Sequence, residues 1–464
     1  MGPLRASAVG TLVLLIVSLL PPASPAAAQA QAPSKELVLS KELVLPEAVR
    51  LALENHPALR AATHGVAAAA AGIQQARAGF LPRVDFSEGF VQSNNPVYAF
   101  GSLLNQGRFT QADFAVDRLN TPDSISNWRT NIYGSVPLFV GGRNYLGFQQ
   151  AQLSHDVSQQ GRARVEQEVI FGVVRAYHTV ILAQEAQATV EASVRTAEAN
   201  LASADARHQA GVVVASDVLA ARVRLARLKE EAIAAANHVQ LAYAALNEAM
   251  GAPQTQSYQV AGHLQVPPVR HEKLDGLDTL ARQHRPDYLQ VTLEETRLEK
   301  EVLKAKGAFL PTLHLMGNYE INNHYFASQG QDSWSVGVVL NLNLFAGGGD
   351  RARLLEAEAN HRRIMAQRER VANAIGLELR EAFLALQTAR ERVGVAEAAV
   401  GQAEESLRIV QDRYDAGLTT IVELLDSETA LTASRTNLTR ARYEAAVGQA
   451  RLELSLGTLD RTGF

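Results

Sequence analysis

Hydrophobic and polar residues alternate along four short segments of the chain, two in each half. The clearest segment spans positions 334–344, and its apolar positions are Trp334, Val336, Val338, Leu340, Leu342 and Leu344. A period of two is typical of a β-strand with one apolar and one polar face. We therefore predict two hairpins, with strands at about 83–93, 128–138, 312–322 and 333–344.

Most of the remaining chain is rich in alanine and has apolar residues spaced three and four apart. In the second half this seam comprises Leu386, Ala389, Val393, Ala396, Val400, Ala403, Leu407, Val410 and Tyr414. A seven-residue repeat indicates helices that pack as left-handed coiled coils. We predict long helices at about 143–210 and 350–416, each on the order of 100 Å long.

The same landmarks recur in order, which indicates an internal duplication. The tripeptide Phe-Leu-Pro at 80–82 recurs at 309–311, an offset of 229 residues. The only two tryptophans, Trp128 and Trp334, lie 206 residues apart. The difference of 23 residues places a longer loop in the first half. The predicted parts are a first repeat at 29–250, an equatorial linker at 251–273 and a second repeat at 274–464.

The N-terminus has the features of a secretory signal. Arg5 precedes the apolar run at 11–20, two prolines end the run, and small-residue cleavage sites follow near Ala28. The run is shorter than the roughly 20 residues that a membrane helix needs. We therefore predict a cleaved signal peptide at 1–28 rather than an anchor.

Charge and motif content exclude several function classes. The 464 residues have a formal net charge of −4 and no basic cluster, so we expect no nucleic-acid partner. The chain has no cysteine, which excludes a disulfide framework and a thiolate metal site. Its 12 histidines are scattered, and no zinc-protease, nucleophile-elbow or phosphate-loop motif occurs. We predict no enzyme activity, no cofactor and no metal.

The predicted strands have the length of membrane-spanning strands, about 9 to 11 residues. In lipid a sheet must close into a barrel, because open edges leave backbone groups unpaired. Four strands are too few, since closure takes about eight or more. Several copies would therefore have to contribute strands. A soluble hairpin packed on a core alternates equally well, so the alternation alone leaves both interpretations open.

The most specific motif lies in the last quarter of the chain. Its parts are Tyr-Asp-Ala-Gly-Leu-Thr-Thr-Ile-Val-Glu-Leu-Leu-Asp at 414–426, Ala-Arg-Tyr at 441–443 and Leu-Gly-Thr-Leu at 456–459. This region resembles the signature of the TolC family of outer-membrane efflux proteins. Together with the repeated Phe-Leu-Pro motif and the motif Leu-Phe-x-Gly-Gly, which occurs at 138–142 and 344–348, the resemblance covers essentially the whole mature chain. It implies a mainly α fold with a membrane β-barrel, in which a homotrimer forms a twelve-strand barrel and a twelve-helix periplasmic tunnel.

The resemblance also implies a function and partners. The chain would be an outer-membrane channel of a tripartite efflux or type I secretion system in a Gram-negative bacterium, extending into the periplasm. It would passively conduct substrates delivered by a periplasmic adaptor and an inner-membrane RND or ABC transporter, and it would contact outer-membrane lipid. One alternative is a periplasmic coiled-coil adaptor, which would have one helical hairpin and no amphipathic strands. Another is a soluble structural coiled coil.

Candidate site residues gather at the ends of the long helices. Gly211 and Gly417 mark the predicted tip turns. By resemblance, Glu423 and Asp426 match the acidic ring that lines the narrow periplasmic entrance, and such a ring attracts cations. Alternatively, acidic residues in a first helical turn simply favour the positive end of the helix.

The resemblance also suggests how the tip is held shut. The family uses a tyrosine, an aspartate and a basic residue, and Tyr414 and Asp217 match the first two. Thr419 stands at the basic position, which removes a charge-assisted bond and leaves Arg413 or Arg207 as candidate substitutes.

Two further features concern the strand ends. We assign Trp128 and Trp334 as membrane-interface aromatics, because such girdles border outer-membrane barrels. The long loop at 93–127 would lie outside the cell, either as a cap on the barrel or as a passive surface insertion.

Overall fold

The structure of the protein is a computed structural model, and it describes residues 42–460. The predicted signal peptide at 1–28 lies outside the described residues. Among residues 42–460, no helix combines the length and apolar character needed to cross a membrane.

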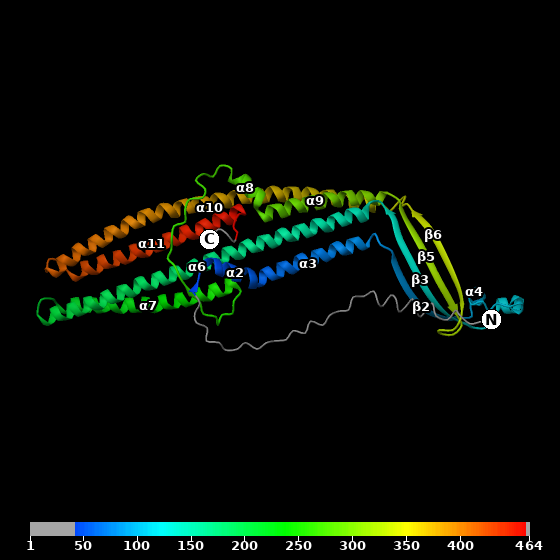
Figure 1. Cartoon of the computed structure of the whole chain (residues 1–464), viewed down its shortest axis with the longest axis horizontal. Coiled ribbons are helices and arrows are strands. Elements are labelled where there is room, and N and C mark those ends of the chain that lie inside the picture. The colour runs from blue at the N-terminus through cyan, green and yellow to red at the C-terminus, as the bar shows by residue number, and fades with distance from the viewer. Residues whose placement is uncertain (1–41, 461–464) are drawn as a thin grey trace. The chain divides into compact units, whose positions relative to one another are not determined.

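Both halves of the chain share one order of main elements: a short helix, a half-length helix, two strands, a long helix and a returning helix (Figure 1). The first repeat comprises β1 (Glu42–Leu43), α2 (Leu45–Asn55), α3 (Pro57–Ala78), β2 (Arg83–Ser93), α4 (Pro96–Asn105), η1 (Gln111–Phe114), α5 (Val116–Asn120), β3 (Ile125–Val140), α6 (Arg143–Gln209) and α7 (Ala215–Met250). The second comprises α8 (Leu277–His284), α9 (Pro286–Lys306), η2 (Gly307–Phe309), β5 (Thr312–Asn323), β6 (Gln331–Asn341), α10 (Gly349–Asp415) and α11 (Ile421–Leu456), after β4 (Gln259–Val260) in the linker.

The long helices pack as antiparallel pairs, α6 with α7 and α10 with α11. Helices α6 and α10 have 67 residues each, and α7 and α11 have 36 each. The half-length helices α3 and α9 pack along α6, and α9 also contacts α10. Because α7 and α11 end where α3 and α9 begin, two shorter helices lie along each long one (Figure 1).

The four predicted strands form one antiparallel sheet in the order β2-β3-β5-β6. Arg83 pairs with Ser135, and its repeat equivalent Thr312 pairs with Asn341, so both hairpins have the same register. Strands β2 and β6 are the edges of this sheet in the described protomer. We call the end that carries Ser93 the outer end of the sheet, since the long helices α6 and α10 begin at the opposite end.

Two strand boundaries differ from the predicted ones. Strand β6 spans Gln331–Asn341 rather than 333–344, because its neighbour β5 begins only at Thr312, the partner of Asn341. Leu342 and Leu344 therefore lie beyond the ladder and are exposed. Strand β3 extends to Ile125–Val140 through an irregularity between Pro137 and Phe139, where proline cannot donate a ladder hydrogen bond.

The linker contributes to the core midway along the helices. Strand β4 pairs in parallel with β1, and the Tyr177 hydroxyl of α6 lies 3.1 Å from the carbonyl of Leu43 and 2.8 Å from that of Ala261. Burial raises the pKa of this hydroxyl above its ordinary value. The linker is therefore a packed element that ties α6 to the start of the described chain.

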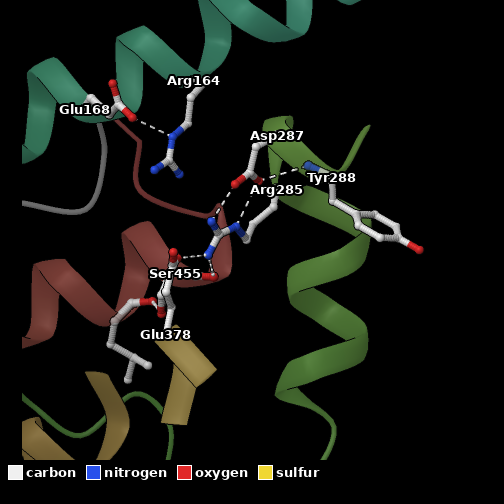
Figure 2. A network of polar contacts seen from close by, with 8 residues as sticks. Arg164, Glu168, Arg285, Asp287, Tyr288, Glu378 and Ser455 are labelled. Atoms are coloured by element: carbon white, nitrogen blue, oxygen red, sulfur yellow. Dashed lines mark hydrogen bonds and ion pairs between the residues drawn. The ribbon is translucent and has the colours of Figure 1, made fainter. Parts of the chain in front are cut away.

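A buried arginine holds the corresponding region of the second repeat. Arg285, between α8 and α9, is 2% exposed and points into the junction with α10 and α11 (Figure 2). Its guanidinium donates to Asp287 at 2.6 Å and to Glu378 at 2.7 Å, and it approaches the carbonyl of Ser455 at 3.4 Å. Burial alone lowers the Arg285 pKa, but the two carboxylates raise it above its ordinary value.

Candidate channel entrance at the helical tip

Two turns of equal geometry join the long helices to the returning helices. Gly211 and Gly417 have φ values of +76° and +73°, a region that glycine adopts without strain. In each turn the glycine N–H donates to the carbonyl three residues back, and the next N–H donates to the carbonyl five residues back. This pattern closes the last helical carbonyls. Helical turns therefore lie at Gly211 and Gly417, and their assignment to the periplasmic tip stays a prediction.

An apolar cluster joins the two hairpins beneath these turns. It gathers small and aliphatic side chains from all four long helices around one tyrosine. The buried members are Ala204, Val218, Ala221, Val410, Tyr414, Ile421 and Leu424. Because both turns share this core, displacement of one hairpin must disturb the other.

Arg207 connects the two hairpins across this cluster. Its guanidinium lies 4.6 Å from the centre of the Tyr414 ring, donates to the Tyr414 carbonyl at 2.9 Å and pairs with Asp415 at 2.7 Å. A cation over an aromatic face is attracted by the ring quadrupole. Of the two candidate basic residues, Arg207 therefore contacts the predicted latch tyrosine itself.

The Tyr414 hydroxyl is buried and has no hydrogen-bond partner among the described residues. Burial raises its pKa above the ordinary value, an effect that the charge of Arg207 opposes and that of Asp217 increases. Asp217 is near enough to act through its charge, but its carboxylate accepts a 3.4 Å contact from Ser216 instead. The structure thus brings Tyr414 and Asp217 to one region without a direct bond.

Thr419 and Arg413 both contact Glu423. The Thr419 hydroxyl donates to one Glu423 oxygen, and Arg413 lies 3.2 Å from the other. Glu423 remains 46% exposed, and Asp426 is exposed one turn further along α11. Thr419 therefore contacts the predicted ring carboxylate through an uncharged donor, while Arg413 supplies the positive charge.

One acidic residue near the tip was missed in the sequence. Glu428 is 8% exposed and accepts a hydrogen bond from Asn200, and a cavity of about 60 Å³ lies beside it. Burial raises the Glu428 pKa, although Asn200 and the charge of Arg224 lower it. The burial of Glu428 could have been predicted from the helical spacing, because it occupies a core position in the series Ile421, Leu424, Glu428 and Leu431.

A metal site is not found in the part of the chain that the structure describes: no three histidine, aspartate or glutamate side chains gather in a suitable arrangement there. The tip has polar and charged side chains, including Arg207, Asp415 and Glu423, above the apolar cluster.

Comparison with known proteins agrees with this architecture. The model of the family described as outer membrane efflux protein matches residues 48–252 and 278–458. The chain is 23% identical to outer membrane protein TolC of Escherichia coli K12, over 91% of this chain and 84% of that protein. It is 24% identical to the alkaline protease secretion protein AprF of Pseudomonas aeruginosa, over 90% and 85%.

Solved structures show the same fold. The outer membrane protein VceC of Vibrio cholerae superimposes with a TM-score of 0.75 at 20% identity, over 89% of this chain and 96% of that chain. A structure of CusC superimposes with a TM-score of 0.78 at 17% identity, over 92% and 95%.

Paired strand hairpins on duplicated long helices define the class of outer-membrane export channels. The chain belongs to the outer membrane efflux protein family. The predicted mainly helical, TolC-like fold and the outer-membrane location are confirmed.

Proposed function

We propose that three copies of this chain form a passive duct through the outer membrane, serving a tripartite efflux or type I secretion system. The observation that carries the proposal is the exposed apolar face of the sheet. On β6, Trp334, Val336 and Leu340 are 74%, 67% and 63% exposed. Apolar area of this extent is stabilised by contact with hydrocarbon, at roughly 25 cal/mol per Å² removed from water.

The duplication supports a specific pairing between copies. Within the protomer, β3 of the first repeat pairs with β5 of the second, so that Ile132 lies opposite Tyr319. The repeat offset of 206 relates Ile132 to Val338 of β6, and the offset of 229 relates Tyr319 to Phe90 of β2. By analogy with the pair Ile132 and Tyr319, Val338 of one copy would lie opposite Phe90 of the next copy. Both side chains belong to the apolar face, as a shared barrel surface requires. Three copies would contribute twelve strands and leave no open edge.

Partners on the periplasmic side follow from the family. TolC and AprF are named as an outer membrane protein and a protease secretion protein. We infer that the present chain likewise receives its cargo from a periplasmic adaptor and an inner-membrane RND or ABC transporter. The chain itself would add a conduit and no catalytic step.

At the tip, Glu423 and Asp426 would supply six carboxylates around the entrance of a trimer. Their charges would concentrate cations and repel anions where the duct is narrowest. Arg207, through Tyr414 and Asp415, would hold the two hairpins of a protomer together in the closed state. Arg413 would position Glu423 in place of the family's basic residue.

The strand pairing can be tested by crosslinking, because the chain has no native cysteine. Val338→Cys combined with Phe90→Cys is expected to give dimers and trimers under oxidation or with a short bis-maleimide. The control combines Val338→Cys with Val84→Cys, on the same face but about 20 Å along the strand. Monomers from both combinations, or equal crosslinking by both, would overturn the proposed barrel closure.

The entrance can be tested in planar bilayers. Glu423→Gln with Asp426→Asn is expected to lower cation selectivity and to weaken block by multivalent cations. The matched control is Glu397→Gln. Glu397 is an exposed residue of α10, away from the tip, and pairs with Arg442 of α11. Selectivity and block equal to those of the control would contradict the acidic ring.

A further inference from the structure

The two strand hairpins have very different connections at the outer end of the sheet. In the second repeat, β5 and β6 are joined by the short turn between Asn323 and Gln331. In the first repeat, residues 94–124 intervene and contain α4, η1 and α5. We call residues 94–124 the insertion.

One face of α4 is buried against the end of the sheet. Ala99 is 1%, Ser102 is 4% and Gln106 is 6% exposed, and their spacing of three and four places them on one side of the helix. The Gln106 amide donates to the Ser126 carbonyl at 2.8 Å and to the Asn127 side-chain oxygen at 2.9 Å. The insertion is therefore docked on the strand ends.

A chain of side-chain hydrogen bonds continues from this contact across the sheet. Asn127 donates to Asn322 at 2.7 Å, and Asn322 donates to Glu320 at 2.7 Å. Asn127 and Asn322 are 6% and 2% exposed. A buried amide that loses its hydrogen-bond partner destabilises the fold, so these bonds fix the position of Gln106 relative to strands β3 and β5.

The bonded residues identify which face of the sheet the insertion covers. Along β3, Asn127 alternates onto the same face as Asn131 and Tyr133, and this face is the polar one. Gly107, directly after Gln106, lies beside the side chain of Gln331, which also belongs to the polar face by its pairing with Asn322. The insertion thus contacts the polar face.

The short turn goes to the opposite face. Phe326 packs on Trp128 with ring centres 5.0 Å apart, and Trp128 packs on Phe90 at 4.7 Å. These rings belong to the apolar face, so the two connections of one protomer diverge.

We propose that the insertion is a fixed constriction at the outer mouth of the duct, which limits the size of solute that can pass. This inference rests on the proposed function, since the polar face lines a lumen only when the sheet closes into a barrel. Each copy then places one α4 over the lumenal rim, anchored by Gln106. The docked and hydrogen-bonded α4 favours a cap over a passive surface insertion.

Size-selective labelling tests the constriction. Tyr133→Cys introduces a thiol on the polar face, six residues or about 20 Å along β3 from Asn127. Intact cells are treated with a small charged maleimide or with one carrying a long polyethylene glycol chain, which reaches the lumen only through the outer mouth. With the insertion present, the large reagent should label the thiol at least about tenfold more slowly than the small one.

Replacing the insertion with a short Gly-Ser turn should remove most of that difference. Labelling by the large reagent that is equally fast with and without the insertion would overturn the constriction. Failure of both reagents to label the thiol in every variant would instead overturn the lumenal assignment of the polar face, and with it the proposed duct. Immunoblots of outer-membrane trimer correct each rate for assembly.

A point substitution keeps the test decisive if the shortened chain does not assemble. Gln106→Leu retains the size of the side chain but removes the amide, and it should speed labelling by the large reagent severalfold. Gln111→Leu makes the same change at an exposed glutamine of the insertion and should have no effect. Equal rates in these two variants would overturn the role of Gln106 as the anchor.

Discussion

Midway along the molecule, each repeat brings the end of a returning helix against the start of a half-length helix. In the first repeat Gly251, after α7, lies against the backbone of His56. In the second repeat Gly457, after α11, lies against the backbone of Arg285. The glycines are equivalent, whereas His56 caps α3 through the Ala58 N–H and Arg285 is a buried ion-pair centre.

The comparison separates geometry from chemistry. Both glycines have positive φ, +66° and +75°, so the close approach of the backbones is the same in both repeats. The polar contacts that accompany this approach differ. We conclude that the end-to-end contact requires glycine, while the second repeat obtains additional stability from charge.

The largest expected effect comes from breaking the shared geometry. A Cβ at position 457 would lie 2.7 Å from the Arg285 Cα, and one at 251 would lie 2.8 Å from the His56 Cα. Gly457→Ala and Gly251→Ala should each destabilise the protein by about 3 kcal/mol or more, measured by thermal unfolding of the detergent-solubilised protein. Gly417→Ala meets nothing within 4 Å and should cost only about 1–2 kcal/mol. Similar losses at 457 and 417 would refute the role of the close contact.

An intermediate effect should distinguish the two repeats. Arg285→Met leaves Asp287 and Glu378 without their shared cation and should cost about 2–3 kcal/mol, because a buried partner has been removed. His56→Ala removes only a cap and should cost about 1 kcal/mol. Arg282→Met, at an exposed pair with Asp278, is the control and should change stability little. Equal losses for Arg285→Met and His56→Ala would remove the proposed difference.

The smallest effect is a pH dependence confined to the second repeat. Burial alone would raise the Asp287 pKa, but the hydrogen bonds and charge of Arg285 lower it below its ordinary value. Its stabilising contribution is therefore complete above the unfolded-state pKa of about 4 and is lost as pH falls through the lower folded-state pKa. The free energy of unfolding of the wild type should exceed that of Asp287→Asn by about 1–2 kcal/mol at neutral pH, and this difference should become smaller in acid. A gap that is constant with pH would contradict this linkage.

Local patterns predicted the elements of the fold well. Strand alternation, heptad spacing and the glycines at 211 and 417 are short-range signals, and the duplication gave each signal twice. The contacts that fix the junction and the outer mouth are long-range. Arg285 contacts a carbonyl 170 residues away in the sequence, and Asn127 donates a hydrogen bond to Asn322, 195 residues away. Helical and strand periodicities extend over a few residues and therefore do not predict such contacts.

The candidate site was predicted less completely for the same reason. The sequence located the two turns, Tyr414 and both candidate arginines. That Arg207 contacts the aromatic ring of Tyr414 and Arg413 contacts Glu423 depends on how the two hairpins pack. Which carboxylates face one another around an entrance depends on subunit contacts, which one chain's periodicity does not encode. The acidic ring and the latch stay predictions.

The equal lengths of the duplicated helices constrain how the protein can change. With 67 residues in α6 and α10 and 36 in α7 and α11, both turns finish at one level. A deletion in one hairpin alone would leave the other hairpin longer and would separate the side chains of the apolar cluster that both hairpins share. A change of length that preserves the fold must therefore be made in both hairpins at once and in whole heptads. The length of the helical part can change only by such paired insertions or deletions.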